Sequence, residues 1–325
     1  MAGAVTRRLL RPLAAVLLAA ALPAWAFDLE GHRGARGLAP ENTLAAFRRA
    51  LAIGVTTLET DLAVTRDGVL VISHDPFLNP DLVRGPDGKW LAARGPAIHT
   101  LTLEELRGYD VGRLDPASKY ATQFPSQVAA DGERFPTFAE VLELARASAG
   151  PARLNVETKI TPQNPGETVD PATFARLVVE AIMRAGMTGR VTVQSFDWRT
   201  LVEIKRLAPT LPTACLTIET ETNDTIKPRG DAASPWTAGL DLRAYSGSVP
   251  RLAQAAGCAT WSPFWRNVTA ANIEEAHRLG LQVLPWTVND AEEMRRLIGL
   301  RVDGIITDYP DRLRAVLADK GMPLP

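Results

Sequence analysis

Short apolar runs alternate with amphipathic stretches along most of the chain. The apolar runs are four to six residues long, and several are bounded by Gly or Pro, which is typical of buried β-strands. Eight such strands are predicted, at residues 28–32, 57–62, 153–158, 190–195, 212–217, 257–262, 282–287 and 304–307. Eight parallel strands are the number that a (β/α)8 barrel requires.

The stretches between these runs carry apolar residues at helical spacing. Leu44, Phe47 and Leu51 follow an i, i+3, i+7 pattern, and similar patterns occur at 138–145, 177–181 and 273–279, the last ending at Gly280. Strands and helices that alternate in series favour a parallel sheet. The predicted fold class is therefore α/β, a (β/α)8 TIM-type barrel.

The alternation is interrupted after the second strand. Residues 65–68 read Thr-Arg-Asp-Gly, a turn signal, and residues 69–74 form a further β run that is expected to return as a hairpin. A turn there pairs residue 64 with 70 and 62 with 72, which brings His74 opposite Thr60. Residues 75–135 then contain one short helix signal, at 103–106, and are too long for an ordinary loop. We interpret 75–135 as an insertion over the barrel mouth.

The first 26 residues have the pattern of a secretory signal peptide. Arg7, Arg8 and Arg11 precede an apolar run at 13–22, which is followed by Pro23 and Ala-Trp-Ala at 24–26. Ten apolar residues span about 15 Å as a helix, roughly half of the bilayer core, so we do not expect a stable membrane anchor. The sequence predicts a periplasmic or secreted single-domain protein of residues 27–325, and leaves twin-arginine export open beside the general route.

Composition and charge exclude some classes of partner. The 325-residue chain is 46% hydrophobic and 22% charged, as in ordinary globular proteins, and its formal net charge of −1 becomes −4 without the three arginines of the signal peptide. A protein without a basic excess is not expected to bind nucleic acid. Cys215 and Cys258 can pair in an oxidising compartment, but each lies in an apolar stretch that suits a reduced, buried thiol equally well.

Charged residues occur within the predicted strands. Glu59 and Asp61 stand two residues apart on the second strand and so share a face, and Glu157 lies on the next strand of the barrel. Carboxylates that are close together and partly buried remain ionised when a cation lies between them, and an all-oxygen site suits Ca²⁺ or Mg²⁺. The alternative is that Glu59 faces solvent or pairs with an arginine.

Two of the four histidines fall at the ends of predicted strands. His32 ends the first strand and His74 ends the returning hairpin, near the carboxylates, whereas His99 and His277 lie elsewhere and are interpreted as packing or capping residues. Arg33 and Lys159, beside a cation, would make an anion site. Two aromatic residues at strand ends, Phe196 and Trp286, either line the barrel mouth or belong to the core beneath it.

Together these segments resemble the glycerophosphodiester phosphodiesterase family. The resemblance is carried by Gly-His-Arg-Gly at 31–34, Pro-Glu-Asn-Thr at 40–43, Leu-Glu-Thr-Asp-Leu at 58–62, Thr-Arg-Asp-Gly at 65–68, His-Asp-Pro at 74–76, Glu-Thr-Lys at 157–159 and Asp-Gly-Ile-Ile-Thr-Asp at 303–308. The export signal and residues 109–112 and 135–137 resemble the bacterial periplasmic branch. The resemblance implies that Glu59, Asp61 and Glu157 are metal ligands, that His32 and His74 are the acid/base pair, and that Arg33 and Lys159 lie near phosphate.

The expected activity is metal-dependent hydrolysis of a small glycerophosphodiester to sn-glycerol 3-phosphate and an alcohol. One divalent cation is expected, with Ca²⁺ favoured and Mg²⁺ possible. The attacking group is water or the glycerol 2-hydroxyl, and the sequence does not assign acid and base between the two histidines. Two alternatives are a lipase related to phospholipase D or to phosphoinositide lipases, with an exposed apolar rim of Trp236, Trp261, Phe264 and Trp265, and a non-catalytic phosphoester-binding protein.

Overall fold

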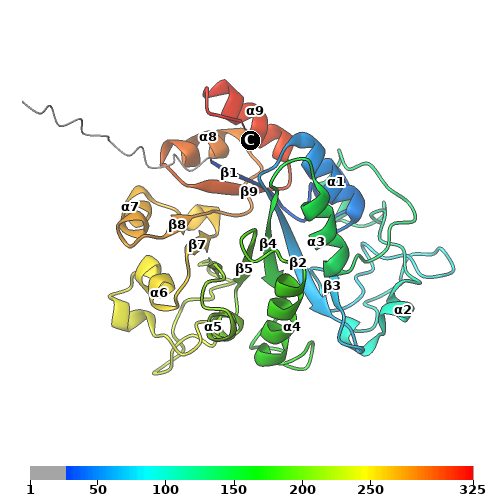
Figure 1. The fold of residues 1–325 in the computed structure, drawn as a ribbon, viewed down its shortest axis with the longest axis horizontal. Helices are drawn as coiled ribbons and strands as arrows, with labels where there is room; N and C mark the ends of the chain where they lie inside the picture. Colours follow the sequence, from blue (N-terminus) through cyan, green and yellow to red (C-terminus); the bar gives the residue numbers. More distant parts are fainter. Residues whose placement is uncertain (1–26, 325) are drawn as a thin grey trace, which may run out of the picture.

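The computed structural model describes residues 27–324, which form a nearly closed barrel of eight parallel strands surrounded by helices (Figure 1). The expected α/β barrel is confirmed. The strands are β1 (Asp28–Gly31), β2 (Thr57–Val64), β4 (Arg153–Thr158), β5 (Val191–Ser195), β6 (Thr213–Thr217), β7 (Thr260–Pro263), β8 (Gln282–Val283) and β9 (Gly304–Thr307), with β3 (Leu70–Ile72) antiparallel to β2. The helices are α1 (Leu44–Ile53), α2 (Leu103–Leu106), α3 (Phe138–Ala147), α4 (Pro171–Arg184), α5 (Trp198–Leu207), α6 (Val249–Ala255), α7 (Ala270–Arg278), α8 (Ala291–Gly299) and α9 (Pro310–Asp319), and there are short 3-10 turns η1 (Ile98–Thr100), η2 (Ala121–Gln123), η3 (Leu242–Tyr245) and η4 (Trp265–Asn267).

The barrel closes between β8 and β9 through single backbone hydrogen bonds. The Asp303 amide donates to the Val283 carbonyl at 3.0 Å, and the Ile306 amide donates to the Pro285 carbonyl at 3.0 Å. The sequence predicts a strand at 282–287, but β8 contains only two residues, because Pro285 has no amide hydrogen for the ladder. The strand predicted at 257–262 likewise begins later, since Gly257 adopts a left-handed turn after α6.

The helices are fixed by their caps and by their apolar faces. The side chain of Thr43 accepts a hydrogen bond from the Ala46 amide at the start of α1, and Gly54 ends that helix with a positive φ of 89°. Thr137 and Glu140 form a capping box at the start of α3. The apolar faces of these helices pack against the strands in one large core.

The β2–β3 hairpin has the predicted register. Leu62 pairs with Ile72 and Val64 with Leu70. After β3, the segment 75–135 contains η1, α2 and η2 and lies beside the hairpin, in cyan and green in Figure 1. Its apolar residues form a second hydrophobic cluster with the outer side of the hairpin, whose buried members are Ala63, Val71, Leu78, Val83, Ile98, Leu106 and Phe135. A small core of its own thus holds this long segment on the barrel.

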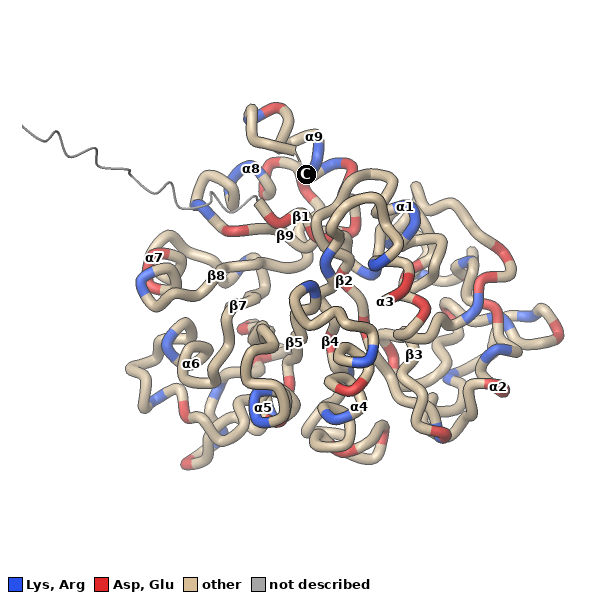
Figure 2. Tube along the Cα trace, viewed as in Figure 1, with Lys and Arg blue, Asp and Glu red and all other residues tan. Residues whose placement is uncertain are grey.

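The predicted signal peptide, residues 1–26, lies outside the described residues. Within residues 27–324, no helix combines the length and apolar character needed to cross a bilayer. Figure 2 shows Lys and Arg interspersed with Asp and Glu over the outer helices, without a large region of a single sign. This distribution agrees with the absence of a basic excess in the sequence.

Cys215 and Cys258, whose state the sequence left open, form a disulfide. Cys215 lies on β6, Cys258 lies between α6 and β7, and their Cα atoms are 5.9 Å apart. The bond encloses a 43-residue separation that includes the long β6–α6 connection. It therefore restricts the unfolded chain over this part of the barrel.

We expect the double variant Cys215→Ala/Cys258→Ala to unfold more readily than the wild type. Loop-closure entropy for this separation predicts a loss of about 4 kcal/mol in the free energy of unfolding. Denaturant titration measures the loss, and thiol titration of the unreduced, denatured wild type should find no free thiol. Two reactive thiols in that titration would contradict the disulfide.

Candidate active site

Three carboxylates from adjacent strands meet at one end of the barrel. Glu59 and Asp61 point to the same side of β2, and Asp61 is in register with Glu157 on β4. One oxygen atom from each lies within 4.8 Å of those of the other two, and all three residues are buried. The structure thus brings together the residues predicted as metal ligands.

Burial and mutual repulsion act strongly on these groups. Burial and the charge of Asp61 raise the pKa of Glu59 well above its ordinary value. Burial also raises the pKa of Glu157 to about 7, although Lys159 opposes the shift. At Asp61 the effect of burial is outweighed by the nearby positive charges, first that of Arg33, so its pKa is lowered. The surrounding side chains therefore do not fully balance the negative charge that the cluster would carry with all three carboxylates ionised.

The donor set fits a hard divalent cation. One oxygen of Asp61, Oδ1, is buried and has no hydrogen-bond partner. This oxygen is therefore available as a metal ligand. Glu59 is fixed from outside the cluster, because its Oε2 accepts from the Arg33 amide at 2.8 Å and its Oε1 from Gln194 Nε2 at 2.8 Å. Oxygen ligands without sulfur or nitrogen suit Ca²⁺ or Mg²⁺.

The turn after β1 adopts an unusual backbone conformation. Arg33 has a φ of 50° and Asn42 a φ of 57°, in the left-handed region that non-glycine residues rarely occupy. This places Arg33 Nε 3.2 Å from Asp61 Oδ2 and lets Asn42 Nδ2 donate to the same oxygen at 2.9 Å. The Arg33 guanidinium also contacts a second carboxylate, because its Nη1 donates to Glu41 Oε1 at 2.6 Å. The local strain is thus tied to the support of the carboxylate cluster.

Lys159 extends from the end of β4 to the same cluster. Its Nζ donates to Glu157 Oε1 at 2.8 Å and lies 3.8 Å from Asp61 Oδ1. Arg33 and Lys159 therefore flank the carboxylates from two sides. An anion that approaches the cluster would meet both positive charges.

His32 lies next to Glu59 and is oriented by Asp308. Its Nδ1 is 2.6 Å from Asp308 Oδ1, and its Nε2 is 3.9 Å from Glu59 Oε2. Burial, followed by the charge of Arg36, lowers the pKa of His32 to about 4, so the imidazole is neutral near pH 7. With the proton on Nδ1 facing Asp308, the Nε2 lone pair is free to accept a proton.

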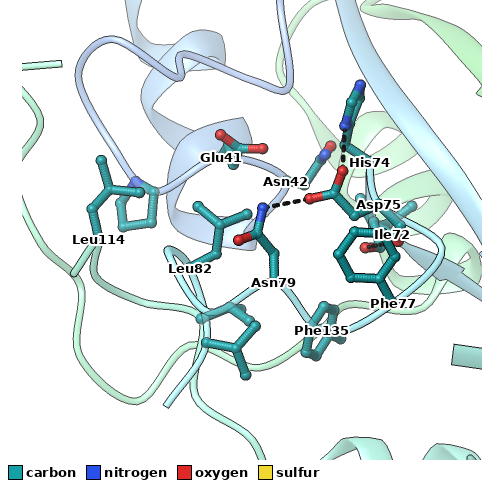
Figure 3. Close-up of a pocket in the computed structure, with 14 residues that line it drawn as sticks. Glu41, Asn42, Ile72, His74, Asp75, Phe77, Asn79, Leu82, Leu114 and Phe135 are labelled. Atoms are coloured by element: carbon teal, nitrogen blue, oxygen red, sulfur yellow. Dashed lines mark hydrogen bonds and ion pairs between the residues drawn. The ribbon is translucent and has the colours of Figure 1, made fainter. Parts of the chain in front are cut away.

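His74 approaches the cluster from the hairpin side. Its Nδ1 is 3.0 Å from Asp75 Oδ1, and Asn79 holds the other oxygen of Asp75 at 2.6 Å, as Figure 3 shows. Burial, followed by Arg33 and Lys159, lowers the pKa of His74. The side chain lines the pocket of the carboxylates and also a second pocket of about 440 Å³, counting its solvent-open part, whose lining includes Phe77 and Leu82.

The carboxylates and histidines open into one pocket of about 560 Å³, counting its solvent-open part. Of the nine residues predicted for the site, only the buried Asp61 is missing from its lining. The lining comprises His32, Arg33, Arg36, Glu59, His74, Glu157, Lys159, Gln194, Phe196, Leu216, Trp286, Thr287 and Ile306. Phe196 and Trp286 face each other edge to face, with ring centroids 5.2 Å apart. The lining therefore combines an apolar wall, formed by Phe196 and Trp286, with charged side chains.

Several residues of this site received no role from the sequence. Gln194 and Asp308 stand at strand ends, a position that signals function in barrels, but their partners could not be assigned. Arg36 and Tyr120 carry no such signal, since Tyr120 lies in the long segment without periodicity. Among the other histidines, His277 pairs with Asp303 at 2.9 Å on the outside of the barrel, and neither it nor His99 lines the pocket.

Comparison with known proteins points to one family. The model of the glycerophosphoryl diester phosphodiesterase family matches residues 32–312. The chain is 31% identical over 282 residues to a glycerophosphodiester phosphodiesterase of Caldanaerobacter subterraneus subsp. tengcongensis, with 87% of this chain and 94% of the relative covered. It is 29% identical over 289 residues to one of Bacillus subtilis, with 88% and 84% covered.

A solved structure shows the same likeness in three dimensions. The crystal structure of a protein from Silicibacter pomeroyi, assigned as a glycerophosphoryl diester phosphodiesterase, is 36% identical and superimposes with a TM-score of 0.81, covering 93% of this chain and 96% of that one. The family match begins at His32, directly after β1, and includes all the other strands of the barrel. This chain therefore belongs to the glycerophosphoryl diester phosphodiesterase family.

Proposed function

We propose that this protein hydrolyses small glycerophosphodiesters, such as glycerophosphocholine or glycerophosphoethanolamine, to sn-glycerol 3-phosphate and an alcohol. One pocket carries the proposal, because it joins two imidazoles, a buried carboxylate cluster and the cationic side chains of Arg33 and Lys159 in a chain of this family. Phosphodiester hydrolysis requires that the negative charge of the phosphate be neutralised, that the attacking hydroxyl lose a proton and that the leaving alkoxide gain one. These groups match those requirements.

Glu59, Asp61 and Glu157 would hold a divalent cation, with Ca²⁺ favoured and Mg²⁺ possible. A bound cation would supply Lewis-acid stabilisation of the phosphoryl oxygens. Arg33 and Lys159 stand beside the same cluster and neutralise the remaining charge of a bound phosphodiester. The apolar wall of Phe196 and Trp286 then faces the carbon-bearing part of the substrate.

The two imidazoles divide the proton transfers. One accepts the proton of the attacking hydroxyl, which belongs to water or to the glycerol 2-hydroxyl, as the new P–O bond forms. The other, protonated at both ring nitrogens when the anionic substrate is bound, donates its Nε2 proton to the alkoxide that leaves when the ester P–O bond breaks. Asp308 and Asp75 each hold Nδ1 of one imidazole, so that both Nε2 atoms remain available for these transfers.

The lipase alternative receives less support from the structure. It requires an exposed apolar rim, but Trp261 is fully buried, and its Nε1 donates to Thr217 Oγ1 at 3.0 Å. The remaining rim candidates, Trp236, Phe264 and Trp265, are half-buried.

We expect turnover of glycerophosphocholine to exceed that of lysophosphatidylcholine by at least tenfold, measured as choline release. Equal or faster turnover of lysophosphatidylcholine would favour the lipase.

We also propose that the mature protein acts in the periplasm or outside the cell. The sequence of residues 1–26 supports export, and so does the Cys215–Cys258 disulfide, since such bonds persist in oxidising compartments. In that compartment the protein would meet glycerophosphodiesters outside the cytoplasm.

Replacing either histidine should remove most of the activity. His32→Ala and His74→Ala each take away one proton-transfer group, so kcat is expected to fall by about 10²–10⁴ in each. His277→Ala, on the outside of the barrel, is the matched control and should keep wild-type turnover. Near wild-type kcat in both active-site variants would contradict the assignment.

Metal removal should abolish turnover reversibly. Without a cation the three buried carboxylates repel one another and the bound phosphate. We expect EDTA-treated protein to be inactive and to regain activity with Ca²⁺ or Mg²⁺, as followed by choline release. Full activity of the metal-free protein would contradict the metal-dependent proposal.

A further inference from the structure

The segment between β3 and α3 reaches the His32 side of the active site through residues 120–128. The Val128 amide donates to the Leu38 carbonyl at 3.0 Å, and Gln127 Nε2 donates to the Arg36 carbonyl at 2.8 Å. Both acceptors belong to the loop that follows β1, the strand that carries His32. Residues 120–128 are thus attached to the backbone next to His32.

Tyr120 places a hydroxyl between two charged side chains of that loop. The hydroxyl donates to Glu41 Oε2 and accepts from Arg36 Nη1 at 3.1 Å. Burial, followed by the charge of Glu41, raises the pKa of Tyr120, so the phenol keeps its proton and can fill both roles. It is the donor to one carboxylate and the acceptor for one guanidinium.

Arg36 connects this hydroxyl to His32. Its Nε and Nη2 donate to the two oxygens of Asp308 at 2.8 and 3.0 Å, a bidentate pair. Asp308 is the residue that holds His32 Nδ1 at 2.6 Å. The guanidinium also lies over the ring of Phe124, 4.8 Å from its centroid. The position of Arg36, and with it that of Asp308, is therefore set partly by residues of the segment.

Glu41 connects the same hydroxyl to the carboxylate cluster. Its other oxygen, Oε1, accepts from Arg33 Nη1 at 2.6 Å, and Arg33 Nε lies 3.2 Å from Asp61 Oδ2. The Tyr120 hydroxyl therefore contacts two series of hydrogen bonds and ion pairs, one that ends at His32 and one that ends at the carboxylate cluster. Because it belongs to both series, it influences both.

We propose that Tyr120 is a positioning residue, through which the segment 75–135 fixes Arg36 and Asp308 and thereby the orientation of His32. The effect on turnover rests on the proposed function, whereas the effect on the His32–Asp308 hydrogen bond does not. Tyr120 is not among the residues that line the pocket, and its hydroxyl acts through Arg36 and Glu41.

The variant Tyr120→Phe isolates the hydroxyl. Its ring packs edge to face on Phe124, with centroids 5.2 Å apart, and this contact survives the substitution. Removing one partner leaves Arg36 Nη1 and Glu41 Oε2 without a buried hydrogen bond, so we expect kcat to fall about tenfold. KM should stay within about twofold and Tm within about 3 °C of the wild type. Tyr109→Phe, in the second hydrophobic cluster of the same segment, is the matched control.

Proton NMR provides a readout that does not depend on turnover. The short hydrogen bond between His32 Nδ1 and Asp308 should give a low-field resonance, assigned by its loss in His32→Ala. We expect this resonance to shift or broaden in Tyr120→Phe and to remain unchanged in Tyr109→Phe. Arg36→Lys removes the bidentate contact between Arg36 and Asp308. This variant should change the resonance and should lower kcat at least as much as Tyr120→Phe does. This second variant decides the question if Tyr120→Phe does not fold.

The outcomes separate the two proposals. A wild type that turns over no glycerophosphodiester refutes the proposed function, and the NMR comparison then still decides the role of Tyr120. A resonance that does not move in Tyr120→Phe overturns the positioning role. So does a kcat within twofold of the wild type in an active enzyme, because the hydroxyl would then be a structural contact only.

Discussion

The crowding of three buried carboxylates on two neighbouring strands is the constraint on which the rest of the site depends. Glu59, Asp61 and Glu157 lie within 4.8 Å of one another at atoms that can ligate a cation. Such a cluster destabilises a fold unless positive charge surrounds it. The strained turn at Arg33, the lysine at the end of β4 and the amide of Gln194 each contact one of its members. Two of the five non-glycine residues with positive φ in the described part of the chain, Arg33 and Asn42, lie where this charge must be balanced.

The two imidazoles approach this cluster from different parts of the fold. His32 comes from the end of β1, and His74 comes from just beyond the antiparallel β3. Each is held at Nδ1 by an aspartate, Asp308 or Asp75, and burial is the first cause that lowers each pKa. Both imidazoles line one pocket, and the acid and base roles proposed for them require no difference in residue type. Only the environment of each distinguishes the two.

The barrel and the heart of the site could be predicted from local sequence, because strand periodicity and i, i+2 spacing determine which side chains share a face. The hairpin register that brings His74 toward Asp61 followed from one turn signal. The supporting contacts could not be predicted: Tyr120 lies 79 residues from Glu41 and 84 from Arg36, in a segment without regular structure. The disulfide was undecided for a similar reason, since burial in an apolar stretch suits a thiol and a disulfide alike.

We propose that the carboxylate cluster holds a single divalent cation. Isothermal titration of Ca²⁺ and Mg²⁺ into metal-free protein tests it most directly, because binding is measured without any assumption about the substrate. We expect one ion to bind per chain in the wild type and in His32→Ala. We expect no binding in Asp61→Asn, because the asparagine side chain has the same size as aspartate but no charge. Absence of binding in the wild type, or equal binding by Asp61→Asn, would contradict it.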